Sequence, residues 1–305
     1  NYILSSNRYN RNFKVADLYQ SGNYGTIRNQ PDIADARGSM SQIEVGNVYL
    51  TGTGIDDGGP DKYTYGFYRP GGSNGVSDNT HIGNIYNLAS PPGPYTDDSY
   101  LSNDTKPSEV ILGAGSIGNE TRNSNIGIDA DNIRTTRGIL SLNGIYLDSS
   151  LVDLNFDNAY SSDVAAIHIA GTIMRNHSNV SIGGKFVNDK NASIYYHIDE
   201  LGTLGIDSTS SINMTGWYET IAAGEPVMRF NSNALEKPNT ERLFFKNADF
   251  INDGSTPLAA AFNVVDTFTV HIDNCRTNTY EFTDQDNIEW EGRMTFGVGT
   301  DSIKD

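Results

Sequence analysis

The sequence predicts an all-β protein, a β-solenoid of short strands stacked along one axis, with its clearest part between about residues 138 and 294. Three observations predict this class. Short apolar runs with alternating polar residues, such as 151–156, indicate strands. Apolar residues at the three-to-four spacing of a helix are almost absent, and residues 218–223 form the best helical candidate. The runs are joined by corners rich in Asn, Asp and Gly, which are turn-forming residues.

The predicted strands follow one another along the whole chain. The first third contains strand-like runs at 43–50, 62–68, 81–88 and 110–112. The later runs are more regular, at 139–142, 151–156, 165–169, 180–182, 193–198, 204–206, 211–214, 227–230, 243–245, 267–272 and 287–290.

Residues 1–136 and residues 137–305 differ in how regularly the strand-like runs recur. Residues 1–136 are interrupted by Gly- and Pro-rich loops at 52–54, 57–60, 70–72 and 91–94, so we expect a loop-rich β region. Its excursions are interpreted as insertions on early solenoid turns. Residues 137–305 are expected to form the solenoid body.

An antiparallel sandwich is the alternative to a parallel coil, because both contain many short strands. Tight hairpin signals are scarce, with Asn143-Gly144 and Asp253-Gly254 as the exceptions. In segments 245–252 and 270–278 an Asn, Asn247 or Asn274, stands at the corner between two runs. Asn tolerates the left-handed backbone conformation, and stacked Asn side chains bond one another along a ladder. These corners favour the parallel coil.

The composition excludes several classes. The 305 residues carry a net charge of −17, which opposes binding to nucleic acid or to anionic membranes but leaves glycans open. No apolar run approaches the ~20 residues of a membrane helix. Cys275 is the single cysteine, so no intrachain disulfide can form, and we expect it to be a small core residue.

The pattern apolar-x-apolar-x-Asn-Cys/Ala-x-apolar at Asn247 and Asn274 resembles the rungs of right-handed parallel β-helix proteins. Pectate-lyase-like enzymes and bacteriophage tailspikes share such rungs. The Asn-, Gly- and Tyr-rich, acidic composition is more similar to tailspikes and tail fibres. The start at Asn1 without Met fits a piece of a longer fibre. The resemblance implies a homotrimer in the virion, outside the cell, in contact with other phage tail proteins and a bacterial surface polysaccharide.

The best candidate site combines aromatic residues with carboxylates. Trp217, Tyr218 and Trp290 are predicted to bind substrate, because aromatic faces stack on sugar C–H groups. Glu219 is the first candidate for catalysis, with Asp199 and Glu200 as partners, because glycosidases use two carboxylates. The structural alternative for both Trp residues is a strand-end anchor.

Other acidic pairs are frequent among 38 Asp and Glu residues, and Asp129/Asp131 and Glu289/Glu291 would share a strand face. His168, His197 and His271 lie in strand-like alternation and are interpreted as structural rung residues rather than bases. The sequence predicts no metal site and no cofactor.

These observations leave three hypotheses. The first is a tailspike or tail-fibre domain that recognises a bacterial surface polysaccharide, with or without an endo-glycosidase or lyase activity that depolymerises it. The second is a structural fibre segment without a site. The third is a secreted pectate-lyase-like enzyme, which ranks last because no cluster of basic residues and carboxylates can be assembled from the sequence.

Overall fold

The computed structural model describes residues 4–6, 11–20, 27–29, 40–51, 66–70, 72–87, 108–113, 120–162, 164–198, 205–232, 242–253, 256–262, 268–279 and 288–299. Every regular element in these ranges is a β-strand, so the predicted all-β class is confirmed. No helix in these ranges is long and apolar enough to span a membrane. The helical candidate at 218–223 was wrong, because a strand runs on to Thr220 and a turn follows it.

The strands form three sheets, A, B and C. Sheet A has the order β1 (Leu4–Ser6), β3 (Ile27–Asn29), β5 (Phe67–Pro70), β8 (Ser108–Gly113), β11 (Gly138–Asn143), β14 (Ile167–Ala170), β17 (Ile194–Ile198), β19 (Met228–Ser232) and β21 (Ala259–Phe262). Sheet B has the order β2 (Arg11–Gln20), β4 (Met40–Leu50), β7 (Ser77–Asn87), β10 (Asn125–Thr135), β13 (Leu151–Ser161), β16 (Asn179–Asn188), β18 (Ser211–Thr220), β20 (Leu243–Ile251), β22 (Phe268–Thr277) and β23 (Ile288–Thr295). Sheet C joins β15 (Ile173–Arg175), β12 (Tyr146–Asp148), β9 (Thr121–Arg122) and β6 (Ser73–Asn74).

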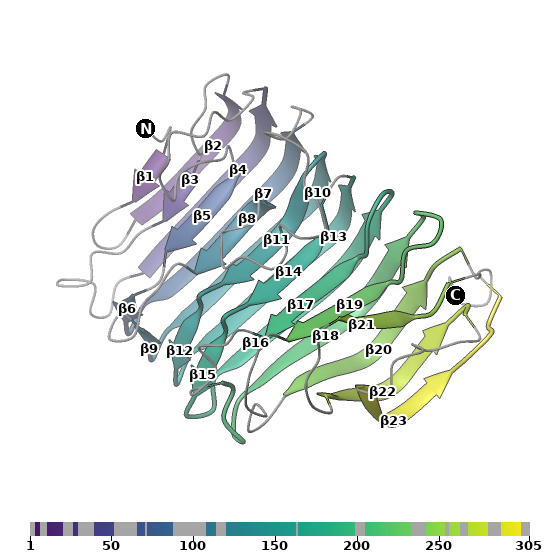
Figure 1. Ribbon diagram of the computed structural model, residues 1–305. Coiled ribbons are helices and arrows are strands. Elements are labelled where there is room, and N and C mark those ends of the chain that lie inside the picture. Colours follow the sequence, from purple (N-terminus) through teal and green to yellow (C-terminus); the bar gives the residue numbers. More distant parts are fainter. Residues whose placement is uncertain are drawn as a thin grey trace.

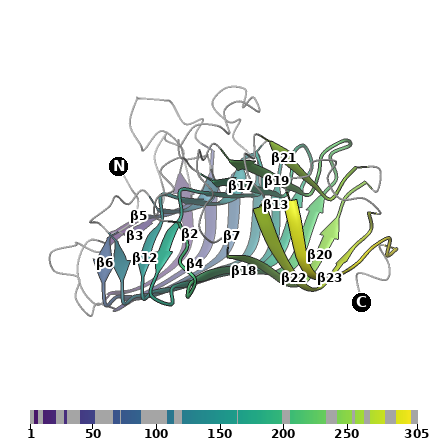
Figure 2. The ribbon, with the colours of Figure 1, turned by 60° about the horizontal axis from the view of Figure 1, so that its bottom comes forward.

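Every strand pair in the described ranges is parallel, so the chain returns to the same sheet after each excursion. Figure 1 shows the strands following one another along one axis, and Figure 2 shows sheets A and B as two layers with sheet C at one edge. This arrangement is consistent with a β-solenoid. β2, β4 and β7 lie in sheet B with the later strands, so the parallel stack includes strands that precede residue 137.

The possible hairpin at Asn143-Gly144 is a corner between two sheets. Gly144 has φ 65° and connects β11 of sheet A to β12 of sheet C. The tight turn therefore leads the chain from one sheet into the next. It does not form a hairpin in which β11 and β12 would pair antiparallel.

The sheet B strands bury alternate side chains and then bend outward. In β13, Val152, Leu154 and Phe156 are buried while the residues between them are exposed. Asp157 and Asn158 are then both exposed, and inward alternation resumes at Ala159. The two adjacent outward residues mark a bend within each long strand, as expected for a β-bulge.

The bend requires left-handed backbone or glycine on the later strands. Gly216 has φ 103°, and a Cβ there would lie 2.1 Å from the Gly184 carbonyl oxygen. At the equivalent corners Asn247 and Asn274 have φ 50° and 54°, as predicted for Asn. Asn274 Nδ2 donates to Asn247 Oδ1 at 2.7 Å, which confirms the predicted ladder.

A second ladder, of serines, closes the corner that precedes the sheet B strands. The backbone N–H groups of Ser124, Ser150 and Ser178 donate to the hydroxyl of the serine in the next coil, at 3.1, 3.2 and 3.1 Å. These serines and Ser210, the last acceptor, are buried. Buried backbone N–H groups need a partner, and the ladder supplies it between coils 26, 28 and 32 residues long.

Aromatic rings fill the core behind sheet B. The ring of Phe186 stacks on Tyr218 at 5.5 Å between centroids, and Tyr218 stacks on Phe250 at 5.8 Å. All three are fully buried, and stacked or edge-on aromatic pairs add to the stabilisation that apolar burial provides. Cys275 is 1% exposed and free, which confirms its predicted place in the core.

The left-handed corner predicts an order of stability among Asn247 variants. Asn247→Val should lower the free energy of unfolding by about 1–3 kcal/mol, because a β-branched residue is strained at positive φ and the ladder bond is lost. Asn247→Gly loses the bond without the strain and should cost about 1 kcal/mol. Urea denaturation followed by circular dichroism measures both, and equal midpoints for the two variants would contradict the proposed strain.

Candidate functional site

The outer face of sheet B, beyond the bend, carries two rows of side chains that run along the stack. We call these two rows together the outer strip. The first row begins with Asp17, Asn47, Asn84 and Asn132, which occupy equivalent positions on successive strands. Asn47 donates to Asp17 at 2.5 Å, Asn84 to Asn47 at 2.6 Å and Asn132 to Asn84 at 2.8 Å. The row is a continuous chain of amide hydrogen bonds.

The second row lies two residues further along each strand and begins with tyrosines. The rings of Tyr19 and Tyr49 stack at 4.9 Å between centroids, and those of Tyr49 and Tyr86 stack at 5.4 Å. The interplanar angles are 12° and 17°, so the shared ring faces are covered by the neighbouring rings. Ring edges, hydroxyls and the end ring Tyr19, which is 71% exposed, are then the parts of the stack that remain for a ligand.

The pKa of Tyr49 is raised by desolvation and by its neighbours Tyr19, Asp17 and Tyr86. The next strands add Arg134 and Tyr160, with the Arg134 guanidinium 5.8 Å from the centroid of the Tyr160 ring. The Tyr160 hydroxyl donates to Asp189 at 2.6 Å, and this bond raises the pKa of Tyr160 to about 12. These phenols remain neutral donors at physiological pH.

The predicted residues Trp217 and Glu219 lie on the same two rows, on β18. Register pairing leads from Tyr160 through Val187 to Glu219 in the second row. In the first row Trp217 lies between Lys185 and Asp249. The outer strip therefore joins the amide and tyrosine rows of the early strands to the predicted site on the later ones.

Trp217 is half-buried and held from two sides. Its indole Nε1–H donates to Glu219 Oε2 at 2.8 Å. The Lys185 ammonium lies 5.3 Å from the indole ring centroid, a cation–π distance. Asp249, on the next strand, is bound by Arg276 through two hydrogen bonds of 2.8 Å. Trp217 and Glu219 are thus positioned together at the surface, as an aromatic ring beside a carboxylate.

Two of the other predicted site residues, Tyr218 and Trp290, do not join this pair. Tyr218 is fully buried in the aromatic core and donates to the Thr215 carbonyl at 2.9 Å, so we correct its role from ligand binding to packing. Alternation along β18 explains this, since its two neighbours face outward. Trp290 packs against the end of the core from β23. Asp199 and Glu200 lie outside the described residues.

Histidines and carboxylates pair across neighbouring strands elsewhere on the outer face of sheet B. His81 Nδ1 bonds Asp129 Oδ2, and His271 Nδ1 lies 3.1 Å from Glu291 Oε2. His271 also stacks on Phe244 at 4.5 Å. One carboxylate of the pair Asp129/Asp131 and one of the pair Glu289/Glu291 therefore has a histidine partner.

The remaining predicted histidines have different surroundings. His168 is fully buried and stacks on Tyr195 at 5.4 Å, whereas the side chain of His197 lies outside the described residues. In the described ranges, no three His, Cys, Asp or Glu side chains are grouped to hold a metal ion.

Sequence reasoning missed both the amide and the tyrosine rows. The local signal exists, since Asn47-Val48-Tyr49 and Asn84-Ile85-Tyr86 repeat Asp17-Leu18-Tyr19. The repeats are separated by 30 and 37 residues, however, so no constant period reveals them.

Comparison with known proteins gives no relative: no family model, no curated protein and no solved structure matches the chain. The geometry described above therefore carries the functional argument by itself.

The His81–Asp129 pair predicts a pH dependence. The hydrogen bond to Asp129 raises the pKa of His81 above its ordinary value of about 6.5, with smaller contributions from Asp131 and Glu44 and opposed by desolvation. The pair thus stabilises the fold fully below about pH 6.5 and loses this effect as pH rises through the raised pKa. Asp129→Asn should return the pKa toward its ordinary value.

An NMR titration of the imidazole protons measures this shift, with His81→Gln to assign the resonance. A His81 pKa at or below about 6.5 in the unmodified protein would contradict the prediction. So would an elevated pKa that survives the Asp129→Asn substitution.

Proposed function

We propose that the protein binds a bacterial surface polysaccharide along the outer strip. The observation that carries this proposal is the alignment of hydroxyl, amide and aromatic groups in two rows across successive strands. Neighbouring strands are spaced about 4.8 Å apart, so the rows present a repeating polar surface along the axis. A linear polymer with repeating hydroxyl groups matches such a surface.

The chemistry of the strip favours a sugar over other elongated ligands. Its early part combines the Asp17 carboxylate with neutral amide and phenol groups, which donate and accept hydrogen bonds as sugar hydroxyls require. Its later part adds the ring of Trp217 beside the Glu219 carboxylate. Aromatic rings contact apolar C–H groups, while carboxylates accept from hydroxyls. The net charge of −17 opposes a nucleic acid on this face.

The proposal extends to the kind of assembly. A right-handed, closed parallel β-helix in a homotrimeric phage tailspike or tail fibre agrees with the parallel sheets and the exposed polar strip. Such a domain would act outside the cell, attached to other tail proteins. A monomer mass in solution or a left-handed coil in an experimental map would remove this part of the proposal and leave the binding face untouched.

Binding is better supported than cleavage. A glycosidase needs a second carboxylate near Glu219. Asp249 is the acidic residue on the neighbouring strand, in register with Trp217, and both of its oxygens accept from Arg276. Glu219→Gln with a reducing-end assay separates the two cases: a cleaving enzyme would lose product formation, whereas a binding protein releases none before or after the change.

Removal of the phenol hydroxyls tests the strip. The triple variant Tyr19→Phe, Tyr49→Phe and Tyr86→Phe keeps the ring stack but loses three hydrogen-bonding groups. We expect affinity for the recognised polysaccharide to fall roughly tenfold or more, with little change in the unfolding midpoint. An array of capsule and O-antigen polysaccharides measures the affinity.

A matched control for the triple variant is Tyr196→Phe, which removes a phenol hydroxyl on β17 of sheet A, away from the strip. Affinity that falls equally in the control and in the triple variant would contradict a site on the strip. Absence of binding to every surface polysaccharide of a plausible host would end the proposal.

Trp217→Ala is expected to weaken polysaccharide binding much more than it lowers stability, because the ring is half-buried at the surface and outside the core. Affinity on the same array and the midpoint of urea denaturation give the two quantities. The core variant Tyr218→Leu should show the opposite balance, with lost stability and little specific effect on binding. Equal losses of both quantities in Trp217→Ala would assign the ring to packing alone.

A rigid structural segment is the second candidate. The serine and asparagine ladders connect one coil to the next at successive corners, which favours a stiff rod. This reading predicts that no variant of the strip changes any binding property, so the experiments above decide between the two.

A further inference from the structure

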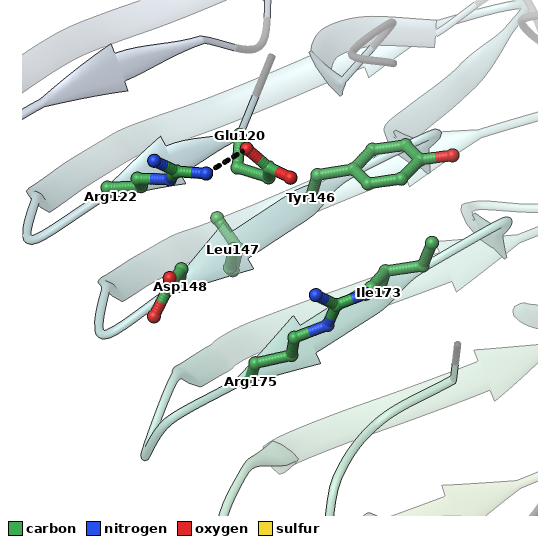
Figure 3. Close-up of a pocket in the computed structure, with 7 residues that line it drawn as sticks. All are labelled: Glu120, Arg122, Tyr146, Leu147, Asp148, Ile173 and Arg175. Atoms are coloured by element: carbon green, nitrogen blue, oxygen red, sulfur yellow. Dashed lines mark hydrogen bonds and ion pairs between the residues drawn. The ribbon is translucent and has the colours of Figure 1, made fainter. Parts of the chain in front are cut away.

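A small pocket lies on the outer face of sheet C, separate from the outer strip. Its polar lining comes from Glu120, Arg122, Tyr146, Asp148 and Arg175, and Ile173 adds an apolar surface. Figure 3 shows Arg122 and Arg175 on the strands to either side of Asp148, with Tyr146 further along the middle strand. Register pairing places Asp148 opposite both arginines. Two guanidinium groups therefore flank one position on this sheet.

The acidic groups of the pocket already have partners. Glu120 Oε2 accepts from Arg122 Nη2 at 2.8 Å. Asp148 Oδ1 accepts from Asn176 Nδ2 at 2.8 Å and from the Ser149 hydroxyl at 3.0 Å. The Arg175 guanidinium has no ion-pair partner in the part of the chain that the structure describes, although it lines the pocket. Its planar array of N–H donors matches a carboxylate in a two-bond geometry.

The rest of the lining suits a sugar ring around such a carboxylate. Tyr146 offers an aromatic surface and Ile173 an apolar contact for C–H groups. Asp148 accepts its two hydrogen bonds through Oδ1, so its other carboxylate oxygen can accept from a sugar hydroxyl. A bare anion would use the guanidinium and leave the ring and hydroxyl-accepting groups without a role.

We propose that the sheet C pocket binds the carboxylate of an acidic sugar, a uronic acid residue within a polysaccharide, through Arg175 with Arg122 beside it. This deepens the proposed function, on which it rests, by naming the class of polymer. Glu120 and Asp148 balance the formal charge of the two arginines, so Arg175 is the cationic contact through which this strongly acidic protein would hold an anionic polymer. Since the contact is ionic and at the surface, added salt should weaken it.

The test uses the full chain on an array of uronate-containing bacterial polysaccharides, each printed beside its carboxyl-reduced, neutral derivative. The unmodified protein should bind at least one acidic polymer roughly tenfold or more tightly than its reduced derivative. Arg175→Gln should remove this preference, and Arg175→Lys should restore part of it, because Lys keeps the charge without the planar fork. Lys246→Gln removes the same charge from an exposed site on sheet B and should leave the preference unchanged.

Four results would overturn the inference. They are equal binding of every acidic polymer and its reduced derivative, a preference that survives Arg175→Gln, a preference lost equally in Lys246→Gln, and full competition by inorganic phosphate at the same concentration of charge. The last would show a general anion site.

Failure here is distinguishable from failure of the outer strip. Loss of all binding in the triple tyrosine variant, with the acidic preference intact in Arg175→Gln, keeps the strip and removes this pocket. Loss of the preference in Arg175→Gln, with unchanged binding by the triple variant, keeps the pocket and removes the strip.

Discussion

The structure depends on parallel stacking, which places equivalent atoms of successive coils about 4.8 Å apart and repeats that displacement at every strand. Buried backbone groups at the corners need hydrogen-bond partners, and several corners find them in the coil beside them. Serines satisfy the backbone before sheet B, and Asn247 with Asn274 bridges the bend. The same displacement aligns the surface side chains. The rows of the outer strip and the hydrogen bonds that stabilise the corners therefore follow from one geometry.

Local features of the fold could be predicted because they depend on near neighbours in sequence. Alternation indicated the strands, Asn at the corners indicated left-handed backbone, and Cys275 was expected in the core. The rows of the outer strip could not be predicted, because they depend on which residues coincide after coils of 26 to 48 residues. Of the predicted cluster, Trp217 and Glu219 lie together for the local reason that they are two residues apart on one strand. Tyr218 lies between them on the same strand, so alternation turns its side chain toward the core.

Charge is divided unevenly over the surfaces. After Asp17, the early part of the outer strip consists of neutral amides and phenols. The pocket of sheet C instead presents guanidinium groups beside carboxylates that already have partners. Histidines accompany Asp129 and Glu291 on the outer face of sheet B. In a chain with net charge −17, such local pairing lets polar surfaces approach a ligand without uniform repulsion.

The unequal coil lengths have a consequence for how this molecule can change. Single coils contain between 26 and 48 residues, yet their sheet B strands keep the same side-by-side register. Each coil adds one strand spacing to the stack, however many residues it contains. The length of the stack therefore depends on the number of coils and not on the number of residues. An insertion at a corner lengthens one coil and leaves the spacing of the sheet B strands intact. The strand stack therefore keeps one repeat distance along its axis, while the segments between its strands can vary in length and sequence.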